Sequence, residues 1–234
     1  DLNDKIGDIV AKLPMASAVF RKYGIDFCCG GSRPLGEAIT EKHLEPEAVL
    51  RDLREAEERA KELADVRDWR SASLTDLVEY VVNRHHAYLR RVLPEVGDLT
   101  TTILRVHGAN HPELSRVHRL FHTLKMDLEQ HLIGEEEMLF PYVKEYERTG
   151  NREALERAVD FIDQVETEHE GAGEILKELR SVTDDYLVPE DGCATFAKTY
   201  KMLDEIEADL FQHIHLENNI LHPRLRLLLN RVSN

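Results

Sequence analysis

The chain has 234 residues, with 45 acidic against 30 basic side chains and a formal net charge of −15. Such a surplus of negative charge repels phosphate groups, which argues against a nucleic-acid-binding protein and against attachment to anionic membranes. No apolar run approaches the roughly 18 residues of a membrane span. Three cysteines are too few for a disulfide framework, and the first residues lack the basic-then-apolar layout of a secretion signal. The sequence therefore predicts a cytoplasmic protein without nucleic-acid or membrane partners.

The first quarter of the chain predicts short helices that begin at prolines, namely Pro14, Pro34 and Pro46. The stretch 64–73 has no helical periodicity and ends at Ser73, a candidate helix cap. We therefore predict a small helical domain over residues 1–66 and a second domain over residues 74–234.

The remainder carries apolar residues three and four apart, the mark of amphipathic helices. The pattern predicts long helices near residues 74–95, 112–147, 152–182 and 193–221. Polar or turn segments separate them, with GDLTT and GANHP in the first gap. We therefore expect an all-α protein whose second domain is an up-down-up-down four-helix bundle.

The second and fourth of these helices share the pattern H-x-x-x-E-x-x-x-L-x-P, from His131 to Pro141 and from His213 to Pro223. In the second helix the pattern continues an apolar stripe whose members are Val117, Phe121, Leu124, Leu128, His131, Glu135, Met138 and Tyr142. Because residues four apart differ by only about 40° around a helix, the imidazole and carboxylate of each pattern can reach a common centre. The two helices are thus predicted to be equivalent halves of one site.

The other two helices also place histidines among apolar residues. His169 lies in the middle of the third apolar stripe, and the first stripe accommodates either His85 or His86. Periodicity alone does not choose between these two.

Histidines on an apolar stripe are often satisfied core residues, and His–Glu pairs often lie at the surface. Here, however, two buried carboxylates would each cost several kcal/mol without cations. The imidazoles would also need partners that their aliphatic neighbours lack. A pair of metal ions meets both demands, and a set of imidazoles and carboxylates without thiolate favours iron or manganese over structural zinc. Of these, iron is favoured.

Several longer motifs point to a family: FRKYGIDFCCGG, DWRSA, HLIGEEEMLFP, ETEHEGAGEIL and HIHLENNILHP. Over almost its entire length the chain resembles the RIC proteins (repair of iron centres), which join an ScdA-type N-terminal domain to a hemerythrin-like bundle. The resemblance implies two iron ions, oxo- and carboxylate-bridged, whose ligands fall on His86, His131, Glu135, His169, His213 and Glu217. It favours His86 over His85, which becomes a neighbouring group or proton carrier. It also implies a polar path to solvent along Asp127 and Glu168.

The resemblance further implies the repair of iron–sulfur clusters damaged by nitric oxide or oxidants. We hypothesise that the bundle supplies the iron from a labile, carboxylate-bridged centre. Damaged iron–sulfur proteins would then be the partners. Two other functions stay open: reduction of nitric oxide at the centre, and binding or sensing of dioxygen or nitric oxide. Whether the protein is an enzyme, and whether it forms a homodimer, is left open.

The remaining candidates are cysteines and one histidine. Cys28 and Cys29 precede two glycines on a loop that we expect to be exposed, which favours reactive or metal-binding thiols that act in transfer or docking. The alternative is a pair of small buried apolar residues. We expect Cys193 to be packed and His222, where the family commonly has phenylalanine, to lie at the surface.

Overall fold

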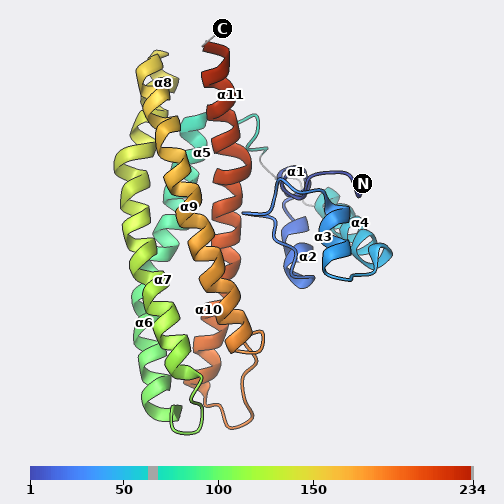
Figure 1. Ribbon diagram of the computed structural model, residues 1–234, viewed down its shortest axis with the longest axis vertical. Helices are drawn as coiled ribbons and strands as arrows, with labels where there is room; N and C mark the ends of the chain where they lie inside the picture. The colour runs from blue at the N-terminus through green and yellow to red at the C-terminus, as the bar shows by residue number, and fades with distance from the viewer. Residues whose placement is uncertain (63–67, 233–234) are drawn as a thin grey trace.

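The computed structural model describes residues 1–62 and 68–232. Its regular structure in these residues is helical, as predicted, and the one β-bridge found there joins Lys5 to Pro34. A long bundle forms the body of the molecule, and a smaller domain lies against one side of it at mid-height (Figure 1). In the described part of the chain no helix is both long and apolar enough to cross a membrane.

The smaller domain consists of short helices, α1 (Ile6–Lys12), α2 (Ala16–Lys22) and α3 (Leu35–Glu41), and the longer α4 (Pro46–Glu62). Its core surrounds Phe20 and Phe27, both fully buried. The predicted boundary at 64–73 falls partly on residues 63–67, outside the described part of the chain.

Four rods make up the bundle. The first is α5 (Leu74–Tyr80), η1 (Val81–His86) and α6 (Ala87–His107); the second is α7 (Leu114–Gly134), η2 (Glu135–Leu139) and α8 (Phe140–Thr149); the third is α9 (Arg152–Val182); the fourth is α10 (Ala194–Leu216), η3 (Glu217–Leu221) and α11 (His222–Val232). They run up, down, up and down, as predicted (Figure 1). The segments η1, η2 and η3 are turns of π-helix.

Two predicted helix ends are wrong. The first rod continues through GDLTT to His107 instead of ending near residue 95. Its threonines do not break the helix, because the hydroxyls of Thr100 and Thr101 donate to the carbonyl of Gly97, one turn back, and Ile103 continues the buried face. The fourth rod continues to Val232 instead of ending at 221.

Apolar side chains fill the bundle in two separate clusters. One includes Leu89, Leu128 and Leu210, and the other includes Leu139 and Leu216. His131 and Glu135 lie between Leu128 and Leu139, and His213 and Glu217 lie between Leu210 and Ile220. The bundle therefore has a polar layer between two apolar halves of its core.

The small domain is attached to the bundle by both apolar and polar contacts. The ring of Phe27 meets that of Phe211 on α10 edge to face, with centroids 5.8 Å apart. The side chain of Asn219 in η3 lies against the backbone at Gly7 and Gly31, where a Cβ atom would come within 2.5 Å of its Oδ1. The two glycines are therefore required for this close approach.

We predict that Phe211→Ala loosens this attachment and exposes the buried Cys28. Losing a half-buried aromatic ring costs about 2 kcal/mol, which raises the open fraction by more than roughly tenfold. Alkylation followed by peptide mass mapping should show Cys28 reacting faster by that factor. The control is Met126→Ala, which removes an exposed side chain and should leave the rate at Cys28 unchanged. An unchanged rate in Phe211→Ala would contradict the prediction.

Candidate metal centre

The side chains predicted as metal ligands lie together in the polar layer, and every rod contributes at least one: His86, His131, Glu135, His169, His213 and Glu217. They form two groups that share both glutamates, and in each group the ligand atoms all lie within 4.8 Å of one another. All six residues are buried. The arrangement satisfies the spatial requirement for a pair of metal sites.

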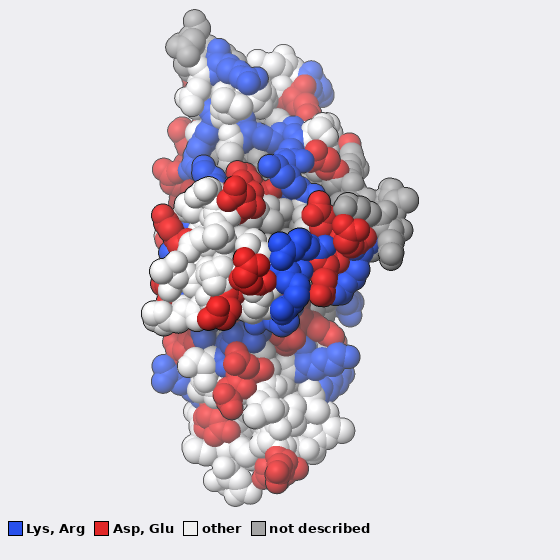
Figure 2. Space-filling view, turned by 90° about the vertical axis from the view of Figure 1, so that its right-hand side faces the viewer, with Lys and Arg blue, Asp and Glu red and all other residues white. Residues whose placement is uncertain are grey.

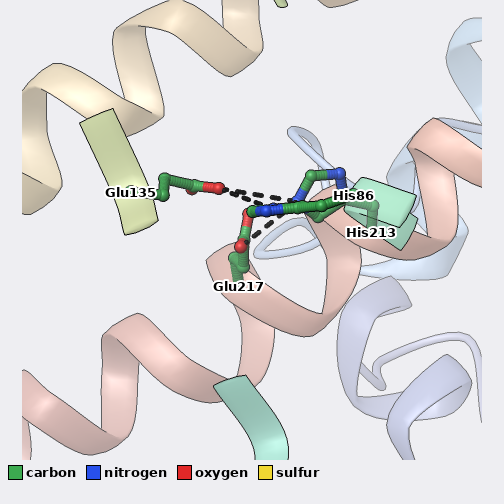
Figure 3. Close-up of side chains that lie close together, drawn as sticks. All are labelled: His86, Glu135, His213 and Glu217. Atoms are coloured by element: carbon green, nitrogen blue, oxygen red, sulfur yellow. Dashed lines mark hydrogen bonds and ion pairs between the residues drawn. The ribbon is translucent and has the colours of Figure 1, made fainter. Parts of the chain in front are cut away.

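The first group joins His86 and His213 to the two carboxylates (Figure 3). His86 Nε2 lies 3.1 Å from Glu135 Oε2, and His213 Nε2 lies 3.3 Å from Glu217 Oε1. The two imidazole nitrogens are 3.2 Å apart. Side chains from three rods thus point at one another across a small space.

The second group joins His131 and His169 to the other oxygen of each carboxylate. His131 Nε2 lies 3.4 Å from Glu135 Oε1, and His169 Nε2 lies 3.2 Å from Glu217 Oε2. These two nitrogens are also 3.2 Å apart. Each carboxylate therefore presents one oxygen to each pair of imidazoles.

Three of the four imidazoles are held by an oxygen acceptor at Nδ1. The acceptors lie 2.6–2.8 Å away and are Glu136 for His86, Glu168 for His131 and Asn218 for His169. An Nδ1–H bond of this kind fixes the tautomer, so that the lone pair of Nε2 faces the centre. This is how metal-binding histidines are usually oriented.

The charges of the layer are strongly coupled. Burial and the neighbouring Glu217 raise the pKa of Glu135, but the surrounding imidazoles outweigh both and lower it to about 2. Burial alone would lower the pKa of His213, yet the two carboxylates raise it to about 10. The carboxylates therefore demand positive charge in this layer, which protons or metal ions can supply.

The unpaired atoms favour metal ions. Neither oxygen of Glu135, nor Oε2 of Glu217, accepts a hydrogen bond from the residues that the structure describes. Lone pairs of buried carboxylates left without donors cost free energy, so such atoms call for a cation. The donor set of imidazole nitrogens and carboxylate oxygens fits a pair of borderline metal ions such as iron.

The backbone adapts at the ligands. The π-turn η1 ends at His86, while η2 and η3 begin at Glu135 and Glu217, whose carbonyls accept from the N–H five residues on. Pro141 and Pro223, six residues after these glutamates, have no N–H for the ordinary bond one turn back. The proline of the repeat thus accompanies the widened turn, a feature common at functional sites.

The repeat also relates residues that sequence reasoning missed. Glu136 and Asn218 occupy the same position of the pattern, directly after the shared glutamates, and each holds an imidazole from a neighbouring rod. Comparing the two copies of the repeat position by position could have found them, because both positions carry an oxygen acceptor.

The expectation for His222 is wrong. It is fully buried, and its ring stacks on that of His169 at 7° and 6.3 Å, as the equivalent Phe140 stacks on His86. Its Nδ1 lies 3.2 Å from Glu166, which Arg226 also binds. His222 thus packs against a ligand histidine as Phe140 does in the other copy of the repeat, and its Nδ1 adds a polar contact with Glu166 on α9.

Of the two adjacent histidines, His86 belongs to the centre. His85 is buried too, but its Nδ1 faces Asp209 at 3.1 Å and its ring stacks on His213 with centroids 5.6 Å apart. Burial lowers the pKa of His85, against the effect of Asp209. Its role as a neighbouring group or proton carrier stays a prediction.

Asp127 and Glu168 line a cavity of about 210 Å³ that reaches His131, His169 and His213. This is the side on which the family resemblance implies a polar path. A cavity of this size admits water or a diatomic molecule to the edge of the centre.

The thiols differ from expectation. Cys28 is buried and Cys29 half-buried, so the loop is not openly exposed. The hydrogen bond to Cys29, burial and the nearby Asp26 raise the pKa of Cys28 well above its usual value.

Cys193, which we expected to be packed, is exposed. The backbone N–H of Phe196 and the side chain of His107 lower the pKa of its thiol to about 7. Cys193 occupies the N-cap position of α10, where the first N–H groups have no partner within the helix and therefore stabilise a thiolate.

The comparisons with known proteins agree with this geometry. Residues 2–57 match the ScdA-type domain of unknown function DUF542, and residues 77–225 match the hemerythrin HHE cation-binding domain. The iron–sulfur cluster repair protein YtfE of Escherichia coli O157:H7 is 35% identical over 220 residues, which cover 94% of each chain. The proteins of the same name from Citrobacter koseri and from Enterobacter sp. (strain 638) are each 34% identical, again over 94% of both chains. The chain belongs to the RIC family. The resemblance found in the sequence is thereby confirmed.

We predict that metal ions stabilise this RIC protein. At a free metal concentration of a hundred to a thousand times the dissociation constant, a bound ion adds roughly 3–4 kcal/mol to the free energy of unfolding. For a chain of this size this corresponds to a rise of about 6–16 °C in Tm. Calorimetry with and without Fe²⁺ should show this shift in the wild type and its loss in Glu135→Leu. The exposed Glu137 provides the matched control, since Glu137→Gln should keep the full shift. An equal shift in Glu135→Leu would contradict the ligand assignment.

Proposed function

We propose that the bundle holds two iron ions bridged by Glu135 and Glu217, and that the protein supplies this iron to iron–sulfur clusters damaged by nitric oxide or oxidants. The observation that carries the proposal is the shared use of both carboxylates. Each directs one oxygen to His86 and His213 and the other to His131 and His169. Two ions seated between these pairs would neutralise both carboxylates.

Ligand chemistry supports delivery rather than permanent storage. Nitrogen and oxygen ligands hold Fe²⁺ less tightly than the thiolates and sulfides of a cluster do, so transfer towards a damaged cluster runs downhill. When bound, the metal pair supplies exchangeable ferrous iron. The protein's own part is to fix the imidazoles through Nδ1 and to keep an opening, the 210 Å³ cavity beside His131 and His169.

The relatives' printed name adds the biological role. They are called iron–sulfur cluster repair proteins and share 94% of their length with this chain. We extend that role to this protein, with damaged iron–sulfur proteins as its partners. Free thiols at Cys28, Cys29 and Cys193 suit a reducing compartment, so we place its action in the cytoplasm.

Transfer of isotopically labelled iron tests the proposal. We expect the loaded wild type to restore a nitric-oxide-damaged iron–sulfur protein in vitro, with the label in the repaired cluster. Glu217→Leu removes a bridging ligand, so it should hold less than about a tenth of the iron and restore correspondingly little. The control is Glu137→Gln. Full repair by iron-free Glu217→Leu, or a repaired cluster without label, would contradict delivery from the bundle.

One observation favours a second function at the same centre. The 210 Å³ cavity opens beside the imidazoles of His131, His169 and His213, and it is wide enough for nitric oxide or dioxygen. The centre could then bind or reduce nitric oxide.

Gas analysis separates reduction from delivery. Anaerobic single-turnover reactions of the reduced, loaded protein with nitric oxide should yield about one nitrous oxide per metal pair if the centre is a reductase, since two nitric oxide molecules share two electrons. Absence of nitrous oxide, together with label transfer, would exclude this second function.

A further inference from the structure

A second group of potential metal ligands lies outside the bundle core, in the loop after α2. Asp26, Cys28 and Cys29 offer a carboxylate oxygen and two sulfurs, all within 4.8 Å of one another. None of the three belongs to the six-residue centre. The group lines a cavity of about 820 Å³ whose walls are formed by the small domain, α9 and α10.

The separations fit a single ion. In a tetrahedral site with bonds of about 2.3 Å to sulfur and 2.1 Å to oxygen, two sulfurs lie about 3.8 Å apart and a sulfur and an oxygen about 3.6 Å apart. Cys28 Sγ lies 3.9 Å from Cys29 Sγ and 3.3 Å from Asp26 Oδ1. The loop thus already holds these atoms near the distances that coordination requires.

The loop has little freedom to change this arrangement. Asp26 Oδ1 accepts the backbone N–H groups of Cys28 and Cys29, both at 3.0 Å. Asn219 of η3 donates its amide to the carbonyls of Phe27 and Cys28. The ligand atoms are therefore preorganised, which reduces the entropy cost of binding.

The charges around the group leave a place for a cation. The nearby basic side chains are already engaged, since Arg21 pairs with Asp204 and Lys177 with Glu174. Among the described residues, Asp26 has no such ion-pair partner. Basic and acidic side chains are intermixed on the side of the molecule that carries the small domain, without one large patch of either sign (Figure 2).

The adjoining helix leaves the group accessible. Gly171 and Gly173 lie in the interior of the continuous helix α9, although a glycine there costs about 1 kcal/mol relative to alanine. Packing does not require them: a Cβ at Gly171 would meet nothing within 4 Å, and one at Gly173 would meet only Cys29 Sγ at 3.8 Å. Gly171 lines the 210 Å³ cavity of the centre, and Gly173 lines the larger cavity of the thiols. Because these two positions carry no side chain, the surface of α9 between the two cavities stays uncovered.

The geometry points to a third metal site: we propose that Asp26, Cys28 and Cys29 together bind one divalent transition-metal ion, such as Fe²⁺, beside the backbone of His169. Cys29 Sγ lies 3.7 Å from the His169 carbonyl, so the ion would sit next to the helix that carries a ligand of the bundle centre. Binding releases the thiol protons to solvent and changes no oxidation state. Three protein ligands leave a position open for exchange with a client.

The purpose of this site, to receive iron on its way out, rests on the proposed function, but its existence does not. Cobalt reports it directly, because thiolate-bound Co²⁺ absorbs in the near ultraviolet by charge transfer, whereas a centre of nitrogen and oxygen ligands gives no such band. We expect anaerobic titration of the metal-free full chain to produce the band, with a plateau absorbance that corresponds to one thiolate-bound ion per chain even though the bundle centre also takes up Co²⁺.

The variants separate this site from the bundle centre. Cys29→Ser should abolish most of the band, and Asp26→Asn, which keeps the acceptor for the turn, should weaken binding by roughly tenfold or more. Cys193→Ser is the matched control and should keep the full band. Glu135→Leu should also keep it, since only the bundle centre is damaged there. Far-ultraviolet circular dichroism verifies that each variant is folded.

A wild type without the band, or a full band in Cys29→Ser, would overturn the third site and leave iron delivery from the bundle untouched. A band that persists in Glu135→Leu, together with failed label transfer by the wild type, would retain the site and overturn the proposed function.

Discussion

Two carboxylates without any exposed surface lie between the apolar halves of a four-helix bundle, and the surrounding structure answers their need for positive charge. Leaving Glu135 and Glu217 ionised and alone would cost several kcal/mol each, a large part of the stability of a typical domain. Imidazoles from every rod approach them, and oxygen acceptors hold three of these rings in place. The convergence of four rods at one level is therefore tied to the chemistry of this layer rather than to apolar packing alone.

The same layer explains how far the sequence predicts the structure. Period-3.6 reasoning places Phe121, His131 and Glu135 correctly on the inner face, but it also predicts Met138 there, which is 49% exposed. The π-turn that begins at Glu135 adds a residue to the turn, so Leu139 takes the buried position instead. A search for regular 3.6-residue periodicity cannot detect the extra residue of a π-turn, so it misplaces the residues that follow.

The error at His222 has the same origin. In a regular helix a residue five positions after Glu217 lies about 140° away around the axis, which predicts the surface. The widened turn η3 brings it back towards the core, where it stacks on His169. The exposure of Cys193 and the length of α6 depend instead on contacts made only in the folded chain, such as the approach of His107. By contrast, five of the six clustered side chains follow from residue type and spacing, because imidazoles and carboxylates recur on the apolar stripes of three helices. The choice of His86 over His85 needed the family resemblance, since the first stripe accommodates either ring.

Three consecutive residues of η3 connect the two parts of the molecule. Glu217 reaches the centre, Asn218 holds the ring of His169, and Asn219 holds the backbone of the cysteine loop. Because these three residues belong to one turn, the same short segment positions a carboxylate of the centre and the loop that carries Cys28 and Cys29. In the proposed function, the bundle would hold iron through nitrogen and oxygen and the loop would hold it through sulfur, so an ion passing from the bundle to the loop would gain tighter binding on its way to a thiolate-rich cluster. The small domain lies at mid-height of the bundle rather than at an end (Figure 1), and Asn219 holds its cysteine loop beside the turn that carries Glu217, so such a passage would be short.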